Sequence, residues 1–259
     1  MKIAVLVKYV PEPTAAWSFK SDFTLDREAV EGRLSELDEY AVEQAVRLVE
    51  GGLDAEITYV TVGPARAVDG LRKALAIGGQ DAVHVLDDGI AGSDALGTSR
   101  VLAAALEKVG FDLVLAGMAS TDAEMSVVPA MVADRLGINQ ATFAGELSVS
   151  DGAVSIRRES DAESVTASAA LPALVTVTDQ TPEARYPAFK AIMGAKKKKV
   201  ATWSLADLGV DPGTVGAGAA LTQVLSLEPE PGRAAGEVVE DDGTAAAQIA
   251  DFLAARGLL

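Results

Sequence analysis

The strongest constraint on the fold is that short aliphatic runs alternate with helical segments along the first half of the 259-residue chain. Residues 3–7, 55–62, 82–86 and 112–116 are runs typical of buried strands. Apolar residues at helical spacing predict helices from residue 37 to the Gly51-Gly52 pair, over 65–77, over 93–109 with Ser93 as the cap, and over about 125–136. Strand, helix, strand at this spacing predicts a doubly wound α/β fold with a mainly parallel sheet and helices on both faces.

The second half has a different pattern. Residues 147–150, 153–158 and 164–169 alternate polar and apolar side chains, and Asp151-Gly152 is a strong signal for a two-residue turn, so an antiparallel hairpin region is expected. A further strand is predicted over 174–178, followed by a loop with one short helix over 179–199. The stretch from residue 11 to 34 is irregular, with a short strand possible over 23–25.

The C-terminal part is an arm by composition. Residues 208–242 are rich in Gly, Pro, Ala and Glu without periodicity, and residues 244–255 then predict an amphipathic helix with Ile249, Phe252 and Leu253 on one face. We therefore expect an α/β domain over residues 1–207 and an arm over 208–259. The arm either packs on a partner subunit or folds back on its own domain, and the sequence leaves both open.

Composition excludes several function classes. The chain has no cysteine and one histidine, which removes thiolate nucleophiles, iron–sulfur ligation and multi-histidine metal sites, and no metal site is expected. His84 falls within a predicted strand, where a packed or hydrogen-bonded role is expected. The formal charge of −16 disfavours nucleic acid and anionic membranes as partners. The first apolar run is too short for a signal peptide, and no run reaches the ~18 residues of a membrane span, so a cytoplasmic protein is expected.

A ligand site is expected where the parallel strands end. In open α/β sheets ligands bind outside the carboxyl ends of the strands, which here means the loops after Val7, Val62 and Ala116. The loop over residues 117–126 has small and hydroxyl side chains before a predicted helix, so its amides could hold the phosphate of a nucleotide. The alternative is that Asp122 or Ser126 only caps the helix.

The segment over residues 179–199 has an apolar stripe beside four consecutive lysines. Tyr186, Phe189, Ile192 and Met193 recur at helical spacing. Such a stripe is either part of the core or an apolar docking surface with a basic rim, and the pattern alone leaves both open.

Five separate motifs carry a family resemblance. They are DQTPEARYPAFKAIMGAKKKK, the opening KIAVLVKYVPEP, LDEYAVEQAVRL, VTVGPARAVDGLRKALAIGGQDAVHV and DLVLAGMASTDAE. Taken in their order along the chain, over about the first 210 residues, these motifs resemble the β subunit family of the electron transfer flavoproteins. The resemblance implies an electron carrier subunit with no catalytic residues, which pairs with an FAD-carrying α subunit, binds one AMP in its own α/β domain and supports a mobile flavin domain.

The resemblance also implies an AMP site. It would consist of Leu6, Val7, Ser35, Glu36, Leu37, Asp38, Val62, Gly117, Met118, Ala119, Ser120, Thr121, Asp122, Ala123, Glu124, Met125, Ser126, Val127 and Val128. Where many members have an Asn-Gln-Thr-Gly type sequence for the phosphate, this chain has Ser126-Val127-Val128-Pro129, and Ser35 replaces a common Asn. Phosphate contact would then rest on Ser126 and backbone amides.

By the same resemblance, residues 183–199 form a partner-recognition segment. Phe189 stands where relatives have a leucine that inserts into an acyl-CoA dehydrogenase, and Tyr186, Ile192 and Met193 accompany it. Glu159 matches an acidic residue that meets an arginine of the flavin domain, although a solvated strand carboxylate is the alternative.

The implied role is electron transfer from acyl-CoA dehydrogenases, as in fatty acid β-oxidation, through FAD held mostly by the α subunit, to a membrane quinone oxidoreductase. Two alternatives remain. One is a flavin-bifurcating form with a second FAD in place of AMP, and the other is a stand-alone adenine-nucleotide-binding protein that resembles universal stress proteins.

Overall fold

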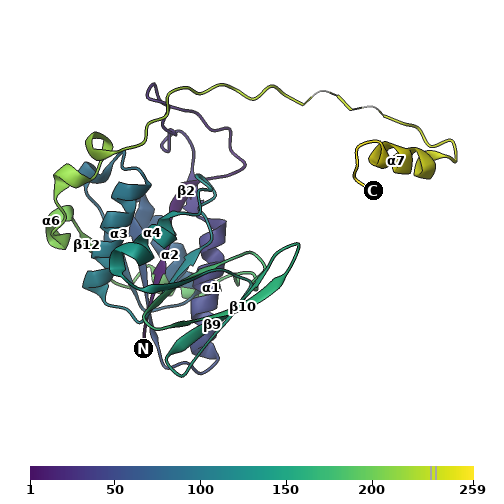
Figure 1. The fold of residues 1–259 in the computed structure, drawn as a ribbon. Coiled ribbons are helices and arrows are strands. Elements are labelled where there is room, and N and C mark those ends of the chain that lie inside the picture. The colour runs from purple at the N-terminus through teal and green to yellow at the C-terminus, as the bar shows by residue number, and fades with distance from the viewer. Residues whose placement is uncertain (234, 237) are drawn as a thin grey trace. The chain divides into compact units, whose positions relative to one another are not determined.

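The computed structural model describes residues 1–233, 235–236 and 238–259. It divides the chain into two units, Met1–Val224 and Leu225–Leu259. The first unit is the α/β domain, and the described residues of the second include one helix, α7 (Ala245–Ala254) (Figure 1).

A seven-stranded sheet is the centre of the first unit. In spatial order its strands are β12 (Val200–Trp203), β5 (Asp81–Val85), β4 (Glu56–Val62), β1 (Lys2–Leu6), β6 (Leu113–Gly117), β11 (Ala173–Val177) and β7 (Asn139–Ala144). Each neighbouring pair in this sheet is parallel. The predicted doubly wound, mainly parallel α/β fold is therefore confirmed.

Helices cover both faces of this sheet (Figure 1). Along the chain the helices of the first unit are α1 (Glu36–Glu50), η1 (Ala65–Ala67), α2 (Val68–Ile77), η2 (Asp88–Ile90), α3 (Ala95–Val109), α4 (Val128–Leu136), α5 (Phe189–Ala195), α6 (Leu205–Leu208), η3 (Pro212–Thr214) and η4 (Ala217–Ala219). α1 and α2 pack on one face, and α3 and α4 pack on the other.

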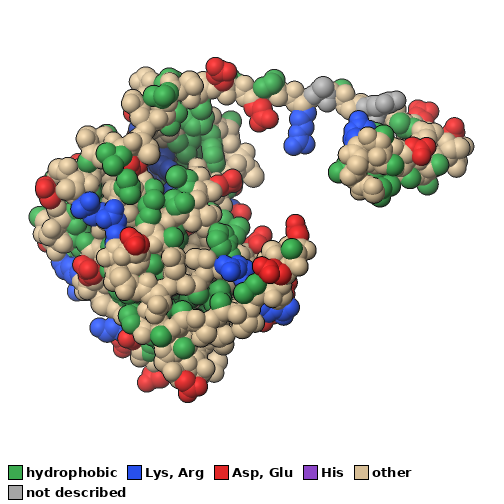
Figure 2. Space-filling view, viewed as in Figure 1, with side chains coloured by type: hydrophobic (Ala, Val, Ile, Leu, Met, Phe, Trp, Pro, Cys, Tyr) green, Lys and Arg blue, Asp and Glu red, His purple; other side chains and the backbone are tan. Residues whose placement is uncertain are grey.

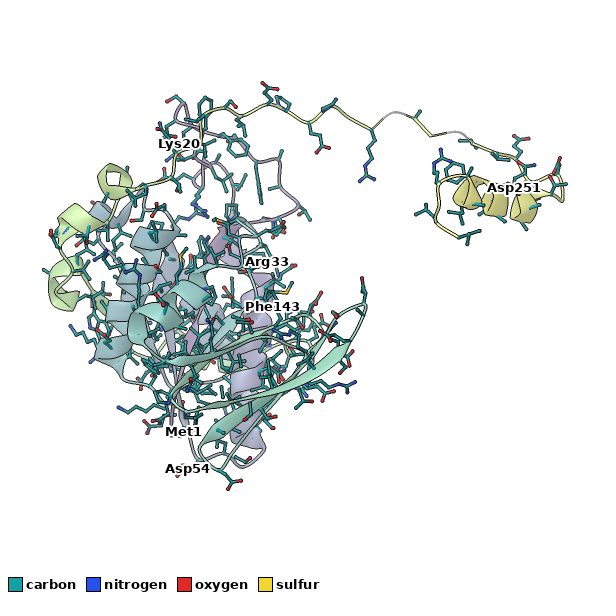
Figure 3. The ribbon with its side chains drawn as sticks, in the orientation of Figure 1. Met1, Lys20, Arg33, Asp54, Phe143 and Asp251 are labelled. Atoms are coloured by element: carbon teal, nitrogen blue, oxygen red, sulfur yellow. The ribbon has the colours of Figure 1, made fainter. Side chains whose placement is uncertain are left out.

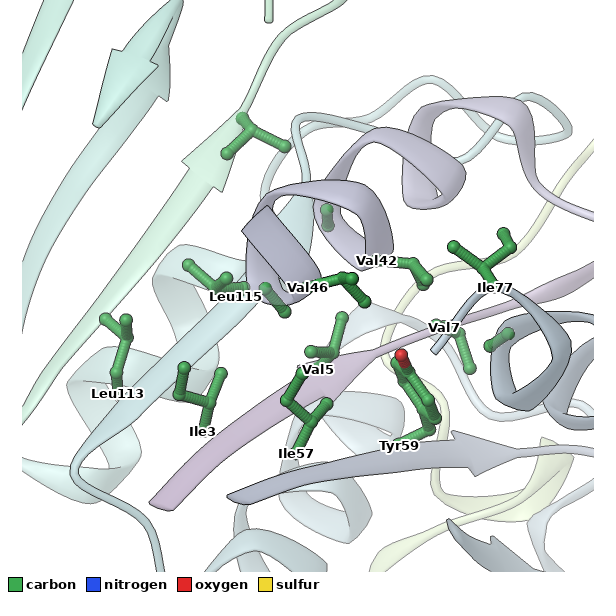
Figure 4. Close-up of a cluster of buried hydrophobic side chains, with 14 of the residues drawn as sticks. Ile3, Val5, Val7, Val42, Val46, Ile57, Tyr59, Ile77, Leu113 and Leu115 are labelled. Atoms are coloured by element: carbon green, nitrogen blue, oxygen red, sulfur yellow. The ribbon is translucent and has the colours of Figure 1, made fainter. Parts of the chain in front are cut away.

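The alternation of side chains along β1 explains how both faces are buried. Ile3 and Val5 point into a cluster with Val42 and Val46 of α1, as Figure 4 shows. Ala4, between them, and Leu6, after Val5, belong to the opposite cluster with the apolar residues of α3 and α4. A strand buried on both faces needs a continuous aliphatic run, which is the pattern seen in the sequence.

Two small antiparallel sheets complete the first unit. β8 (Glu146–Ser150), β9 (Ala153–Glu159) and β10 (Ser164–Ala170) form one, and β2 (Tyr9–Pro11) pairs with β3 (Gly32–Leu34) in the other. Asp151 and Gly152 have positive φ angles of 51° and 74°, as a type I′ hairpin requires. The predicted antiparallel hairpin region is confirmed.

Some local predictions are wrong. α3 is capped by Asp94, whose side chain accepts from the Gly97 amide, whereas Ser93 Oγ donates to the Ile90 carbonyl at 2.7 Å. α4 begins at Val128 rather than near residue 125. The strand expected over 23–25 is reduced to one bridge between Phe19 and Leu25. β7 and β12 were not predicted.

The first unit extends further than the 1–207 domain expected from composition. Val210 and Val215 are buried in the cluster on the α3 and α4 side. Farther along, the Leu221 amide donates to Asp94 Oδ2 at 2.8 Å. Residues 208–224 therefore pack on the α/β domain, and the separate arm is Leu225–Leu259.

The predicted C-terminal helix is present as α7. None of its residues is buried, and Ile249 and Phe252 are exposed. Figure 2 shows hydrophobic side chains on the surface of this helix. Across the described ranges of the chain, no helix combines the length and apolar character needed to cross a membrane.

The two ends of the sheet can be located by labelled side chains in Figure 3. The Met1 ammonium donates to the Asp54 carbonyl at 2.9 Å, at the end where β1 begins. Arg33, on β3, lies toward the opposite end, where the parallel strands of the sheet end (Figure 3). The candidate site is at this carboxyl end.

Candidate functional site

The crevice expected from topology is at the carboxyl ends of β1, β4 and β6. From β1 the chain passes to β4 and β5 on one side of the sheet and then returns to β6 on the other side of β1. This is the reversal of strand order at which open α/β sheets bind ligands. Leu6, Val7, Val62 and Gly117 lie at these strand ends, and Ser35 to Asp38 begin the helix above them.

Asp38 joins three of these segments. Its Oδ2 atom accepts from the Lys8 amide at 2.8 Å, after the end of β1, and its Oδ1 atom accepts from the Gly117 amide at 3.2 Å, at the end of β6. Burial raises the pKa of the Asp38 carboxyl to about 7, although these two amides act in the opposite direction. The first turn of α1 is thus fixed against both strands that border the crevice.

Ser35 occupies the N-cap position of α1. Its side chain is fully buried and makes no capping bond to its own helix within the described structure; instead the Thr121 amide donates to Ser35 Oγ at 3.4 Å. Its own amide donates to the Lys8 carbonyl at 2.9 Å. Ser35 therefore connects α1 to β1 and to the loop that follows β6.

Gly117 allows α1 to approach this closely. A Cβ atom at this position would lie 2.7 Å from Asp38 Oδ1 and 2.7 Å from the Leu37 carbonyl oxygen, which is closer than a real Cβ contact. Because one of these atoms belongs to the backbone, a side chain at residue 117 would force α1 away from β6.

Asp122 fixes the loop after β6 to the other side of the crevice. Its side chain is fully buried; Lys8 Nζ lies 2.9 Å from Asp122 Oδ1, and Arg27 forms a second ion pair with Oδ2. Burial raises the pKa of Asp122, but the charges of Lys8 and Arg27 outweigh this effect and bring the pKa to about 2. The carboxylate is thus fully charged near neutral pH.

The start of α4 has free hydrogen-bond donors. Its N-cap is Val127, so neither Asp122 nor Ser126 caps the helix, contrary to that alternative. Glu124 and Ser126 have positive φ angles of 50° and 56°, a left-handed backbone that prevents an earlier start of the helix. Among the residues described, no hydrogen bond is made by the backbone amides of Met125, Ser126, Val127 and Val128.

This helix start suits an anion. The first turn of α4 contains no acidic side chain, whereas the first turn of α1 contains Glu36, Asp38 and Glu39. Free amides and the helix dipole both favour negative charge at a helix start. At the start of α1 the acidic side chains would repel an anion, whereas the start of α4 has no such side chains. The amides of Ser126, Val127 and Val128 and the Ser126 hydroxyl are therefore donors that could hold an anionic group.

The remaining residues of the expected site differ in exposure. Leu37, Val62, Met118, Ala119, Ser120 and Thr121 are half-buried, whereas Glu36, Ala123, Glu124 and Met125 are exposed. The loop after β6 is thus covered at its start and exposed from Ala123 to Met125.

The stripe on residues 183–199 is on the surface. Tyr186 is 92% exposed and Phe189 is 78% exposed, while Ile192 and Met193 on α5 are about two-fifths exposed. Such side chains are not part of a core, so the core interpretation is wrong. What remains is an exposed apolar surface, which we name the docking segment (residues 186–194).

One of the four lysines after this segment is structural. Lys198 Nζ donates to the carbonyls of Leu75 and Gly79, at 2.9 and 2.7 Å, and its burial lowers its pKa. Lys196, Lys197 and Lys199 are exposed.

The structure brings the docking segment close to the expected nucleotide loops. A cleft of about 410 Å³ is lined by Glu36, Leu37 and Thr121 from the nucleotide set and by Ala184 and Tyr186 from the recognition segment. Sequence reasoning did not connect the two sets, because their residues are far apart along the chain.

Glu159 is separate from these residues. It is exposed at the end of β9, where it pairs with Arg157, and no ion pair or hydrogen bond of the described residues joins it to residues 183–199. His84 is buried on β5 with Nε2 2.9 Å from the Gly63 carbonyl, which confirms the packed, hydrogen-bonded role expected for it. Within the described part of the chain, no group of three His, Asp or Glu side chains could hold a metal ion.

Two residues of the site were missed from sequence. Lys8 lies just after the first strand, at the carboxyl end of the sheet. Because ligands bind at that end, its position in the sequence could have identified it as a site residue. Arg27 lies in the irregular stretch between β2 and β3, where no pattern distinguishes it.

Comparison with known proteins agrees with the motifs. The chain matches the family model described as the electron transfer flavoprotein domain over residues 22–208. It is 42% identical to the electron transfer flavoprotein subunit beta of Mycobacterium leprae and 41% identical to that of Mycobacterium tuberculosis, in each case covering 99% of both chains. It is 30% identical to the subunit beta of Megasphaera elsdenii over the full length of both. The chain therefore belongs to the electron transfer flavoprotein family and is one of its beta subunits.

Proposed function

We propose that this chain binds one AMP in its crevice, pairs with an FAD-carrying α subunit, and uses its docking segment to receive flavin dehydrogenases. The heterodimer would serve electron transfer from acyl-CoA dehydrogenases, as in fatty acid β-oxidation, to a membrane quinone oxidoreductase. FAD, bound mostly by the α subunit, supplies the redox chemistry. This chain contributes binding and support rather than bond-making chemistry.

The observation that carries the proposal is the exposed stripe on the docking segment. Folded chains rarely expose large apolar side chains side by side unless a partner covers them. Here Tyr186 and Phe189 are mostly exposed, and Lys196, Lys197 and Lys199 lie close by along the chain. An aromatic anchor with a charged rim is a common form of protein interface, since the anchor gives affinity and the rim favours encounter.

The free amides at the start of α4 support the nucleotide part of the proposal. The phosphate would accept hydrogen bonds from Ser126, Val127 and Val128. Gly117, which has no side chain, allows the start of α1 to lie against the end of β6. AMP would be held by its phosphate there and by the strand ends at Leu6 and Val7. Bound nucleotide would cross-link α1, β1, β6 and α4, and so stiffen the surface next to the docking segment.

The proposal also includes two contact surfaces for the α subunit. We place the association with the α subunit on the arm, Leu225–Leu259, because its terminal helix exposes Ile249 and Phe252. We place contact with the flavin domain at Glu159, which is exposed at the end of β9.

Reconstitution tests the proposed function. The chain and its α subunit are co-expressed, mixed with an acyl-CoA dehydrogenase and its substrate, and the bleaching of flavin absorbance is followed. Rapid bleaching that requires both chains supports the proposal. Equal rates with the α subunit alone would contradict a role for this chain in transfer.

A further inference from the structure

Arg185, directly before the docking segment, is held by two carboxylates of α1. Its Nε and Nη2 atoms donate to the two oxygens of Glu43, each at 2.9 Å. Its Nη1 and Nη2 atoms donate to the two oxygens of Glu50, at 2.6 and 2.8 Å. The Arg185 amide also donates to Glu43 Oε2 at 3.2 Å, so both the side chain and the backbone of this residue are fixed.

Glu43 is the buried half of this arrangement. Its side chain is only 1% exposed, so its charge must be compensated. Burial raises the pKa of Glu43, but the hydrogen bonds from Arg185 and Arg47 outweigh this effect and hold it below its ordinary value. Only a guanidinium can satisfy two carboxylates at once in fixed geometry, which a lysine ammonium cannot reproduce.

The other end of the docking segment is held by α2. Arg72 Nη1 donates to the carbonyls of Ala195 and Lys198, both at 2.7 Å, just after the segment. In the segment whose two ends these arginines hold, Pro187 is half-buried and the other residues of 186–194 are exposed. α5 itself packs against α2, so the order of the segment depends on that contact and on Arg72, while Arg185 holds its start.

We infer that Arg185, through Glu43 and Glu50, is a positioning residue that fixes the docking segment in its binding conformation before the dehydrogenase arrives. This inference rests on the proposed docking function. A segment ordered in advance loses less conformational entropy on binding, so a looser segment binds its partner more weakly. The rate of transfer in the formed complex does not depend on it.

The test uses the complete heterodimer with the Arg185→Gln variant. The transfer rate is measured against dehydrogenase concentration, so that half-saturation and maximal rate are separated. We expect the half-saturating concentration to rise roughly tenfold, which corresponds to about 1.4 kcal/mol, with the maximal rate within about twofold of wild type. Trypsin cleavage after Lys190 is expected to be roughly tenfold faster.

Arg47→Gln is the matched control. Arg47 Nε also donates to Glu43, at 2.8 Å, but Arg47 lies on α1 and makes no ion pair with the docking segment among the described residues. Arg47→Gln should leave both half-saturation and cleavage at wild-type values. If Arg185→Gln folds poorly, Glu50→Gln replaces it, because Glu50 is exposed and the change removes its negative charge and one of its two acceptor oxygens from beside Arg185.

The outcomes separate the two levels of the argument. If Phe189→Ala leaves transfer unchanged, the docking function itself is wrong. If Phe189→Ala impairs transfer but Arg185→Gln and Glu50→Gln change neither half-saturation nor cleavage, only the positioning role is overturned. A lower maximal rate with normal half-saturation in Arg185→Gln would also overturn it.

Discussion

Asp38 Oδ1 lies 3.2 Å from the Gly117 nitrogen, so the first turn of α1 rests directly on the last residue of β6. This contact forms one side of the expected nucleotide crevice. The contact requires a glycine at the end of β6 and a buried carboxylate acceptor on α1, so substitution of either residue should disturb it.

Gly117→Ala should destabilise the domain. The new methyl group would lie 2.7 Å from Asp38 Oδ1 and from the Leu37 carbonyl, so α1 must shift, at a cost of about 1–3 kcal/mol. Thermal unfolding measures the loss, and nucleotide binding should weaken with it. Gly218→Ala is the control, because nothing lies within 4 Å of a Cβ at that position. An unchanged melting temperature for Gly117→Ala would show that the contact is not rigid.

Asp38 should make stability depend on pH. The pKa of its carboxyl rises from an ordinary 3.8 to about 7 in the folded chain, so the folded state holds this proton more tightly than the unfolded state. The stability that Asp38 contributes is therefore full below about pH 4 and falls as the pH rises to about 7. The melting temperature of wild type relative to Asp38→Asn should be higher at about pH 5 than at about pH 8. A difference that stays constant over this range would contradict the raised pKa.

Phe189→Ala should impair docking without affecting the fold. Because Phe189 is 78% exposed, its removal leaves no cavity, and the melting temperature should stay within a degree or two of wild type. Truncation of an interface anchor commonly costs ~2 kcal/mol, so transfer at low dehydrogenase concentration should fall about thirtyfold. Phe19→Ala, which removes another exposed aromatic, should have little effect. A large loss of stability with normal transfer would refute the docking role.

Removal of residues 225–259 should weaken association with the α subunit and leave the first unit folded. The cut is placed after Val224 because a cut nearer the α/β domain, before Val215, would remove a side chain that is buried in that domain. Analytical ultracentrifugation of the truncated chain with the α subunit measures the change. Heterodimers of unchanged affinity would favour an arm that packs on its own domain.

The sequence predicted those parts of the fold in which side-chain pattern and burial coincide. The strands at residues 3–7 and 112–116 are aliphatic because they are buried on both faces, and the structure confirms both. β7 (Asn139–Ala144) escaped prediction because half of its residues are exposed and its Asn, Gln and Thr side chains break the aliphatic pattern. The later start of α4 had no signal either, because Glu124 and Ser126 adopt a left-handed backbone that is rare outside glycine.

The candidate site was predictable where topology determines it. Gly117 follows from the loop after Ala116, whereas Ser35 and Asp38 came from the family resemblance, and the structure places the three close together. The ion pairs were not predictable, because Lys8 and Asp122 are 114 residues apart and Arg185 and Glu43 are 142 apart. Pairing at such separation depends on the packed structure rather than on any local pattern.

Identification of the bound nucleotides tests the central claim most directly. The heterodimer of this chain and its α subunit is purified and denatured. The released nucleotides are then separated, and the molar ratio of each nucleotide to protein is measured, with the isolated chain treated in parallel. We expect one AMP and one FAD per heterodimer, and a colourless isolated chain that releases no flavin. Two FAD per heterodimer, or flavin in the isolated chain at equal amount to protein, would contradict the account and favour a bifurcating form. Release of ATP from the isolated chain would instead favour a stand-alone nucleotide-binding protein.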